Sequence, residues 1–524
     1  MKIRNCKVGL NMTSGGALAQ TVGSVTFIDS FVEDTSVAIW TSLTSDPSSY
    51  SNGSLVLENV SFRNVSVAVQ GSQNTTLLAG ATGSMNVEAW GQGHLYNPEG
   101  PYGFQGTMSP FPRPDSLVKH GKYYERSKPS YARTPPSQFI SVRNYGAKGN
   151  GLADDTAALQ KTILAAASAG KLVFVDAGTY RVSETIYIPG GSKIVGESFS
   201  VIMASGPIFA NMSDPKAVVR VGKSGEVGHV EWSDMIVATQ GPEAGAVLIE
   251  WNLASHGQPS GMWDVHTRIG GFAGSKLELA DCPATPNTSF GNRTLSSPPT
   301  RTSDTAFSNG IPANVTIPPV YSNGTAPSAR NSSNVDLSYL NKACIGAFMS
   351  MHVTKSATGL YMENNWLWTA DHSLDTGFTN ITVYSGRGLY IESERGNLWV
   401  VASSVEHHAL YQYQLADTQS IFMGQIQTET AYYQPHPDLR APFPAKKSFN
   451  DPNDAAVCQQ NGTNCDGWAL RIVNSQDINV YGAGFYSFFN DYNTCEYSKA
   501  IRGGSIRRLM ADFDVLSLLL PCQR

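Results

Sequence analysis

Short runs of alternating apolar and polar residues fill the first part of the chain. They include VGSVTFIDSFV, SVAIWTS, GSLVLENVSF and SVAVQGS, and Asn and Gly separate them. A period of two is typical of β-strands with one buried face, and Asn and Gly favour tight turns. The pattern therefore predicts a strand-rich unit over residues 1–96.

The next residues, 97–138, carry Pro, Gly and charge without any period, which predicts a linker. A second strand-rich unit is predicted over residues 139–495. Its opening stretch predicts a single helix that begins near Thr156, with Asp155 as the N-cap, followed by strands. No strict repeat follows, but short strands between Gly and Asn turns indicate the irregular coils of a solenoid.

Two segments break this pattern. Residues 284–340 are rich in Pro, Ser, Thr and Asn, which predicts a flexible, glycosylated insertion. Residues 496–524 are basic and then apolar, and we expect an atypical tail there. The chain opens with MKIRNCKVGL, which resembles an interior strand and not a signal peptide. We therefore expect a chain that is truncated within its first β-rich unit.

Composition limits the class of partner. Charged residues make up 15% of the chain and the net charge is −5, with no basic stripe. This argues against a nucleic-acid partner, and the lack of an apolar run long enough to span a bilayer argues against a membrane protein. A neutral partner fits best.

Sequons and cysteines point to an oxidising compartment. Thirteen Asn-x-Ser/Thr sequons predict a secreted glycoprotein. Among the seven cysteines, Cys282 and Cys344 flank the predicted insertion and are candidates for a disulfide, and Cys458 and Cys465 could close a small loop. No CxxC pair of the zinc-site type is present, and the chemistry predicted below needs no metal.

Two carboxylates stand out in the region 385–435. Glu406 and Glu429 lie about one solenoid coil apart, among aromatic and amide side chains. On neighbouring coils their side chains would project from one face, about 5 Å apart along the sheet. Paired carboxylates beside aromatic rings suit the cleavage of glycosidic bonds.

Longer motifs resemble known families. YGAKGNGLADDTAALQ, FVDAGTY and IVGES resemble the entry module of the pectate-lyase-type β-helix superfamily, which identifies a fold and not a reaction. ENNWLWTADHSLD, SSVEHHALYQYQL and GQIQTETAYYQP, with VGSVTFIDS, SGMWDVHTR and NSQDINVYGAGFYSFF, resemble glycoside hydrolase family 55, the fungal and bacterial β-1,3-glucanases.

The resemblance implies an all-β fold of two tandem right-handed parallel β-helices side by side, of which the first is incomplete here. It implies a monomeric, cofactor-free hydrolase that acts from the chain end on β-1,3-glucan polysaccharide or oligosaccharide, with inversion. Two other interpretations stay open. One is a pectin-active β-helix enzyme, a polygalacturonase or lyase, although region 385–435 has no Asp pair. The other is a non-catalytic carbohydrate-binding fragment.

By this resemblance Glu429 is the general acid. Such an acid must keep its proton, so we expect burial and the second carboxylate to raise its pKa. Glu406 is expected to bind substrate or tune the acid; alternatively, it is a structural carboxylate paired with His407 or His408. These adjacent histidines should point to opposite faces of a strand, which makes them a poor metal chelate.

The remaining candidates bind sugar or water. Asp371 and Trp368 match the subsite for the terminal sugar, although Trp368 could instead pack in the core, and alternation places Trp366 on the same face. Tyr432 is expected to contact substrate or tune the acid. Gln20 and Ser42 are the positional matches for groups that hold the attacking water, or they are ordinary turn and strand residues.

Overall fold

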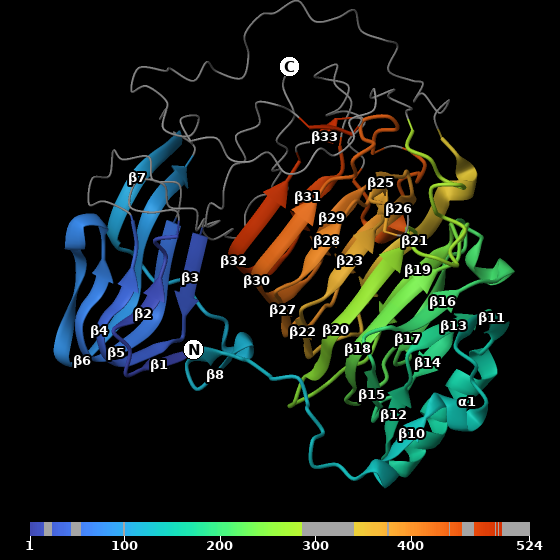
Figure 1. Cartoon of the computed structure of the whole chain (residues 1–524), viewed down its shortest axis with the longest axis horizontal. Helices are drawn as coiled ribbons and strands as arrows, with labels where there is room; N and C mark the ends of the chain where they lie inside the picture. The colour runs from blue at the N-terminus through green and yellow to red at the C-terminus, as the bar shows by residue number, and fades with distance from the viewer. Residues whose placement is uncertain are drawn as a thin grey trace, which may run out of the picture.

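The structure is a computed structural model of the chain. It describes residues 1–14, 24–42, 54–97, 100–285, 340–374, 377–439, 441–452, 466–487, 489–490 and 492–494. Two β-rich units lie side by side, the first in blue and the second in green to red (Figure 1). The predicted tail and nearly all of the predicted insertion lie outside the described residues.

The first unit combines parallel coils with an antiparallel cover. Its parallel strands belong to successive coils, and residues stacked in neighbouring coils are about one coil length apart in the sequence. Asn64, for example, lies above Asp34 at a separation of 30 residues. Two antiparallel strands then extend the sheet, the first paired with the last parallel strand and the second paired with the first. The strands are β1 (Lys2–Arg4), β2 (Val8–Asn11), β3 (Ser24–Ile28), β4 (Phe31–Trp40), β5 (Ser54–Gln70), β6 (Thr76–Asn97) and β7 (Gly100–Thr107).

Coil corners carry stacked Asp and Asn residues in the left-handed backbone region. Asp29 and Asn59 have φ of 51° and 52°, and the Asn59 amide donates to the Asp29 carboxylate at 2.5 Å. Asp and Asn tolerate this region better than other non-glycine residues. Each corner therefore turns the chain and links its coil to the next.

The predicted linker includes β7 and then runs along the second unit, with a small hairpin of β8 (Val118–Lys119) and β9 (Lys122–Tyr123). Its polar side chains form a buried cluster at the junction of the units, here called the junction cluster. Arg113 pairs with Asp29 at 2.6 Å and with Glu58 at 2.8 Å. Tyr481 of the second unit donates to Glu58, and its hydroxyl lies 2.9 Å from that of Tyr123.

The second unit opens with helix α1 (Thr156–Ala169), which begins where predicted. Asp155 occupies the N-cap position, but its carboxylate accepts from the backbone of Lys148 and Gly149 instead of the helix. Asp154 accepts the hydrogen bond from Thr156 N at 3.0 Å. Leu159 and Ile163 bury one face of the helix against the first coils.

The rest of the second unit is a parallel β-helix, as predicted, with three faces that we call A, B and C. Long strands bend around the corner between faces A and B, and the third face is a separate sheet. Face A holds β10 (Phe139–Ser141), β12 (Leu172–Val175), β15 (Lys193–Gly196), β22 (Leu360–Glu363) and β27 (Leu398–Val401), and face B holds β11 (Asn150–Asp154), β13 (Gly178–Val182), β16 (Ser200–Ala204), β23 (Trp366–Thr369) and β28 (Ser404–Glu406). Both faces share the long strands β18 (Glu231–Thr239), β20 (Ser260–Ile269), β30 (Gln419–Glu429) and β32 (Gln476–Tyr486). Face C holds β14 (Ile186–Ile188), β17 (Lys216–Val221), β19 (Ala246–Trp251), β21 (Ile345–Val353), β26 (Tyr384–Ile391), β29 (Tyr411–Ala416) and β31 (Trp468–Val473), and two hairpins add β24 (His372–Ser373) with β25 (Thr379–Asn380) and β33 (Phe489–Asn490) with β34 (Asn493–Thr494).

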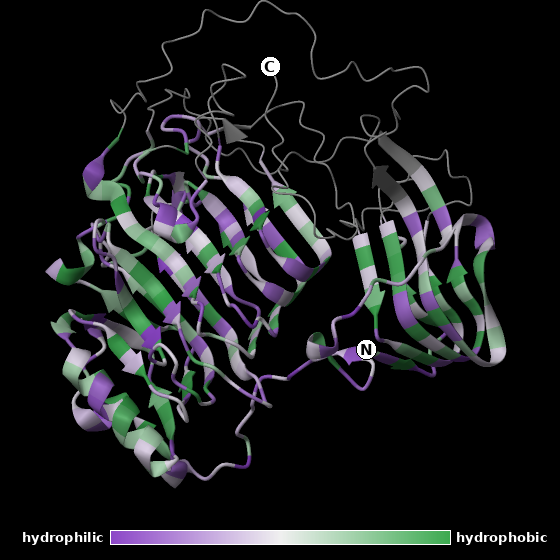
Figure 2. Cartoon of the chain, turned by 180° about the vertical axis from the view of Figure 1, so that it is seen from behind, coloured by the Kyte–Doolittle hydropathy of each residue, from purple (hydrophilic) through white to green (hydrophobic). Residues whose placement is uncertain are grey.

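Inside the β-helix, equivalent residues of successive coils stack into apolar rows. One row runs through Trp232, Met262, Met362, Val400 and Met423, all at most 2% exposed. Hydrophobic and hydrophilic positions alternate along many of the strands (Figure 2). The period of two thus directs alternate side chains into this core.

The outside of face A is apolar as well, because the linker covers it. Trp399 donates its indole N–H to the carbonyl of Leu117 at 3.1 Å, and Tyr123 packs on Phe422 with ring centroids 4.4 Å apart. At the edge beside the first unit, Thr26 of β3 lies against Gly482 of β32. The linker therefore joins the two units through a shared core.

Face C is covered by residues 431–452, here called the strap, which follow β30 directly. Arg387 of β26 forms a buried ion pair with Asp451 of the strap, and both side chains are 0% exposed. Phe443 is buried against the same face, and Gln414 of β29 donates to the carbonyl of Phe449 at 2.8 Å.

No helix in the described part of the chain is long and apolar enough to cross a membrane.

Candidate active site

Three neighbouring strands of face B bring the predicted residues into one row. The register pairs Trp368 of β23 with Glu406 of β28, and Glu406 with Glu429 of β30. Neighbouring strands lie about 4.8 Å apart. The prediction that the two glutamates occupy adjacent coils is confirmed, and their roles stay predictions.

Glu406 accepts hydrogen bonds from a neighbouring row of side chains, in which Trp366, Ser404 and Gln427 are aligned across the three strands. The indole N–H of Trp366 donates to Oε2 at 2.8 Å, and Ser404 and Gln427 donate to Oε1 at 2.5 and 3.3 Å. Because three donors fix a buried carboxylate, Glu406 has a defined position. Neither of the expected histidine partners is among these donors.

Glu429 is the more accessible of the two carboxylates. Its side chain is 19% exposed, and its Oε2 accepts a hydrogen bond from the Tyr432 hydroxyl at 2.5 Å and lies 3.3 Å from His407 Nε2. His407 therefore pairs with Glu429 and not with Glu406. His408 points elsewhere, toward Ser350 and Gln412.

The predicted rise in the pKa of Glu429 is wrong for the protein without substrate. Burial raises this pKa, but the hydrogen bonds from His407 and Tyr432 and the charge of His407 lower it below its ordinary value. For His407, burial lowers the pKa, while its hydrogen bond to Glu429 and the charges of Asp371, Glu406 and Glu429 raise it above the ordinary value. The pair is thus stabilised as imidazolium and carboxylate.

Asp371 lies just after the end of β23, the strand that carries Trp366 and Trp368. Its Oδ1 is 3.0 Å from Nδ1 of His372 and 3.6 Å from Nδ1 of His407. Burial raises its pKa, but the hydrogen bond from His372 and the charges of both histidines lower it below the ordinary value. Asp371 therefore presents a carboxylate beside the Glu429 pair.

The two tryptophans share a face, as alternation predicts, but differ in access. Their rings lie 5.0 Å apart, and Trp366 is 43% exposed while Trp368 is 2% exposed. The guanidinium of Arg268 lies 5.7 Å from the Trp368 ring centroid. Trp366 thus offers an indole face that is open to solvent, and the buried Trp368 ring packs against the Trp366 ring. Exposure of this kind has no signal in the sequence, because alternation gives both tryptophans the same face.

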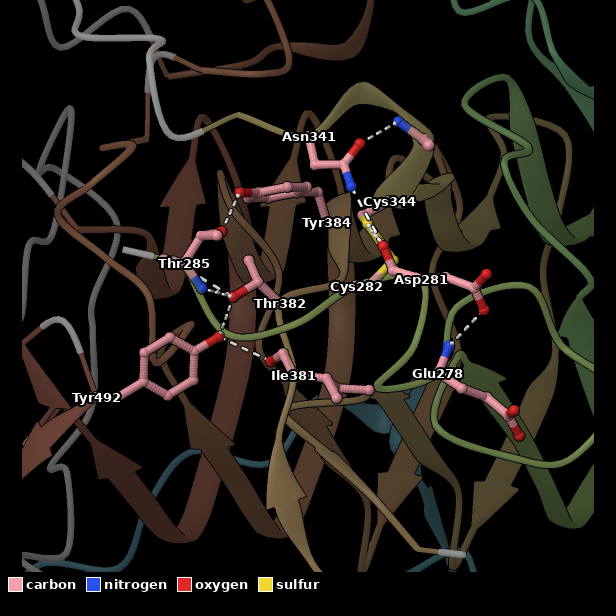
Figure 3. Close-up of a disulfide and its surroundings, with 11 residues drawn as sticks. Glu278, Asp281, Cys282, Thr285, Asn341, Cys344, Ile381, Thr382, Tyr384 and Tyr492 are labelled. Atoms are coloured by element: carbon pink, nitrogen blue, oxygen red, sulfur yellow. Dashed lines mark hydrogen bonds between the residues drawn. A yellow bond between two sulfur atoms is a disulfide. The ribbon is translucent and has the colours of Figure 1, made fainter. Parts of the chain in front are cut away.

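The predicted disulfide between Cys282 and Cys344 is present, and Figure 3 shows it together with Tyr492 and the hydrogen-bond partners of that residue. The Tyr492 hydroxyl donates to the carbonyl of Ile381 at 2.7 Å and hydrogen-bonds with Thr382, while Tyr492 N donates to the carbonyl of Tyr432. The residues beside the disulfide thereby support the residue that donates to Glu429.

Other predicted residues lie elsewhere. Ser42 follows β4 in the first unit and is buried, and its role as a water-holding group stays a prediction. Gln20, Cys458 and Cys465 lie outside the described residues. Within the described ranges, no three His, Cys, Asp or Glu side chains gather in the manner of a metal site.

Comparisons with known proteins place this geometry in context. A family model described as "Rhamnogalacturonase A/epimerase, pectate lyase-like" matches residues 139–222, the first coils of the second unit. A laminarinase structure, sacteLam55A from Streptomyces sp. SirexAA-E, is 15% identical with a TM-score of 0.38, covering 89% of this chain and 63% of that one. So low a score carries no argument about the site.

Curated relatives carry more weight. A protein named glucan 1,3-β-glucosidase from Cochliobolus carbonum is 40% identical over 94% of this chain and 55% of its own length. A probable glucan endo-1,3-β-glucosidase from Arthroderma benhamiae is 32% identical over 94% of this chain and 61% of its own. The chain thus spans little more than half the length of these relatives. The chain is thus similar, over 94% of its length, to fungal proteins named glucan 1,3-β-glucosidase and probable glucan endo-1,3-β-glucosidase, and it carries a parallel β-helix fold of the pectate lyase-like type.

Proposed function

We propose that this chain hydrolyses laminarin-type β-1,3-glucan from the chain end, by a single displacement that inverts the anomeric carbon. The observation that carries the proposal is the row of Glu406 and Glu429 beside the exposed indole of Trp366, in a homologue of a glucan 1,3-β-glucosidase along 94% of its length. Carboxylates give acid catalysis and anchor hydroxyls, and an open indole stacks on the apolar face of a sugar.

The surroundings of Glu406 argue against a role as nucleophile. Retaining enzymes hold their two carboxyl groups about 5–5.5 Å apart and inverting enzymes about 6.5–9.5 Å apart, so the spacing of about 4.8 Å between the two strands does not by itself support inversion. Glu406 is 7% exposed, and both of its carboxylate oxygens already accept hydrogen bonds. We therefore assign Glu406 to the support of the site, and in this proposal the attacking water approaches from the side away from face B.

In this proposal Glu429 protonates the glycosidic oxygen. Its lowered pKa means that the protonated form is populated in acidic medium, so we expect an acidic optimum with activity lost on the alkaline side. Asp371 accepts hydroxyls of the terminal sugar and Trp366 stacks on its ring, while Glu406 fixes the indole through its N–H. The water-holding groups, for which Ser42 and Gln20 are the candidates, come from the first unit.

The pectin alternative has one observation behind it, the family model at residues 139–222. Those residues form α1 and the first coils and include none of the site residues, so the match follows the fold and not the site. Hydrolysis of a neutral glucan agrees better with the named relatives.

We also propose an extracellular, monomeric, glycosylated protein. Sequon asparagines lie exposed at five described positions: Asn11, Asn64, Asn74, Asn211 and Asn380. Mass spectrometry of the protein secreted from a fungal host, before and after enzymatic removal of N-glycans, tests this. Unmodified peptides at all five positions would contradict it.

The central experiment measures glucose release from laminarin by the wild type, Glu429→Gln and Glu406→Gln. We expect Glu429→Gln to lose about 10²–10⁴-fold in kcat, and Glu406→Gln to raise KM. Proton NMR of the first product should show α-glucose, because inversion of a β-glucan gives the α-anomer. Release of β-glucose would refute inversion, and full activity of Glu429→Gln would refute the acid assignment. Binding without glucose release, unchanged in Glu429→Gln, would favour a carbohydrate-binding fragment. An unsaturated product from polygalacturonate would favour the lyase.

A further inference from the structure

His407 contacts Glu429 through both its backbone and its ring. Its N–H donates to the Glu429 carbonyl at 2.9 Å, and Nε2 lies 3.3 Å from Oε2 of the Glu429 side chain. The other ring nitrogen, Nδ1, lies 2.8 Å from the carbonyl oxygen of Thr369. Because a carbonyl oxygen only accepts, Nδ1 must carry a hydrogen, which fixes the ring with Nε2 toward the carboxylate.

The neighbouring His408 shows that this arrangement is specific. It is as deeply buried as His407, but its Nε2 lies 2.7 Å from Ser350 Oγ and its Nδ1 lies 3.1 Å from Gln412 Oε1. Burial lowers the pKa of His408 to about 3, so this ring is neutral. The backbone of His407 is left-handed, with φ of 67°, and this turn directs the His407 ring toward the carboxylates and away from the direction of the His408 ring.

The groups around the His407 ring come from several neighbouring segments of the second unit. Asp371, after β23, lies 3.6 Å from Nδ1, while Glu406 on β28 and Glu429 on β30 contribute negative charge. The ring of Tyr432, at the start of the strap, packs edge-on with centroids 4.4 Å apart. His372 Nδ1 lies 3.0 Å from the same Asp371 oxygen, Oδ1. The ring therefore lies among carboxylates that favour its charged form.

We propose that His407 is the positioning residue for the Glu429 acid: it donates to Oε2 together with Tyr432 and so leaves Oε1 to carry the catalytic proton. A carboxyl proton on Oε2 would displace one of these two donors, whereas a proton on Oε1 displaces neither. This inference rests on the proposed function of the site. It adds a residue and an oxygen atom to the chemistry.

The Oε1–H bond of Glu429 breaks as the proton moves to the glycosidic oxygen, the C1–O bond breaks, and C1 bonds to the oxygen of the attacking water. The proton that the water loses passes to solvent, and Oε1 regains one from solvent. The negative charge left on Glu429 is met at Oε2 by the hydrogens of His407 and Tyr432, which stabilises the departure of the proton.

The test compares His407→Asn with His408→Asn in the whole chain. Asn tolerates the left-handed backbone at position 407 and cannot become an imidazolium. We expect His407→Asn to move the alkaline limb of kcat/KM upward by about 1 pH unit or more, because the charge that lowers the pKa of the acid is gone. It should also lower kcat about tenfold or more with little change in KM. His408→Asn removes an equally buried histidine and should leave the limb in place.

Two results would overturn the inference: an unchanged limb in His407→Asn, or an equal shift in His408→Asn. Imidazole nitrogen-15 NMR of the wild type gives a readout that needs neither activity nor a stable variant. His407 should be charged at pH 6 while His408 is neutral; a neutral His407 at that pH contradicts the proposal. A wild type that releases no glucose refutes the proposed function, and the NMR result still decides the pairing.

Discussion

The buried ion pair under the strap gives the sharpest stability prediction. Asp451→Ala removes the carboxylate that binds Nε of Arg387 at 2.9 Å and also its terminal nitrogen, with both side chains 0% exposed. The guanidinium is left buried without a counter-ion, for which the typical cost is about 3–5 kcal/mol. The Phe348 ring, 4.0 Å from the guanidinium, leaves no polar replacement on that side.

This cost appears first in the strap. If it exceeds the free energy that holds residues 441–452 on face C, the strap opens locally and Arg387 reaches water. We therefore expect Asp451→Ala to be cleaved faster in the strap by limited proteolysis, in addition to a lower melting temperature. Asp417→Asn is the matched control, because Asp417 is exposed, its carboxylate accepts only from Asn474 and Asn450 among the described hydrogen bonds, and Asn tolerates the left-handed backbone at this position. It should change stability by about 0.5 kcal/mol or less.

The double variant Arg387→Met with Asp451→Leu separates the pair from the shape of the site. An apolar pair of similar volume removes the unpaired charge, so it should recover most of the loss in Asp451→Ala. A wild-type melting temperature and wild-type cleavage rate in Asp451→Ala would refute the reasoning, and so would a double variant that is no more stable than the single one.

Further predictions concern the site and its supports. Trp366→Ala should raise KM for laminarin about tenfold, because it removes both the stacking face and the donor to Glu406, and Trp366→Phe should recover part of the loss; an unchanged KM in the Ala variant would exclude Trp366 from the subsite. Replacing Cys282 and Cys344 by Ser opens a link across 62 residues and should lower the free energy of unfolding by about 4 kcal/mol, measured by denaturant unfolding; equal midpoints would contradict this. The pKa of His407 is raised on folding, so its charge contributes stability below about pH 6.5 that is lost as pH rises through the folded-state pKa. The melting temperature of the wild type should fall over that range, and His407→Asn should not show this fall.

Sequence spacing predicted the placement of the glutamates because coil length is a property of the chain itself. Two carboxylates one coil apart must meet on a parallel β-helix, and the register of Glu406 with Glu429 follows. The period of two also placed Trp366 and Trp368 on one face. Helix α1 begins at Thr156 as predicted, although it is Asp154 and not Asp155 that accepts from Thr156 N.

The pKa shift and the exposure that the sequence could not predict depend on contacts between segments that are far apart along the chain. The sign of the Glu429 pKa shift follows from the ring of His407, which is aimed by a backbone turn and the Thr369 carbonyl. Burial and a second carboxylate, the two grounds of the prediction, would both raise the pKa of a carboxyl group. The relative exposure of the two tryptophans likewise depends on neighbouring coils and not on their own motif.

The linker also sets an order for folding during synthesis. Its residues Arg113 and Tyr123 emerge early, but Phe422 and Tyr481, which complete the core and the junction cluster, come much later, Tyr481 at 358 residues after Tyr123. A chain made from its N-terminus therefore leaves the first unit without this support until the last coils close. During that interval the apolar side of the linker is open to water, and early docking of a chaperone or a wrong strand competes with the native junction.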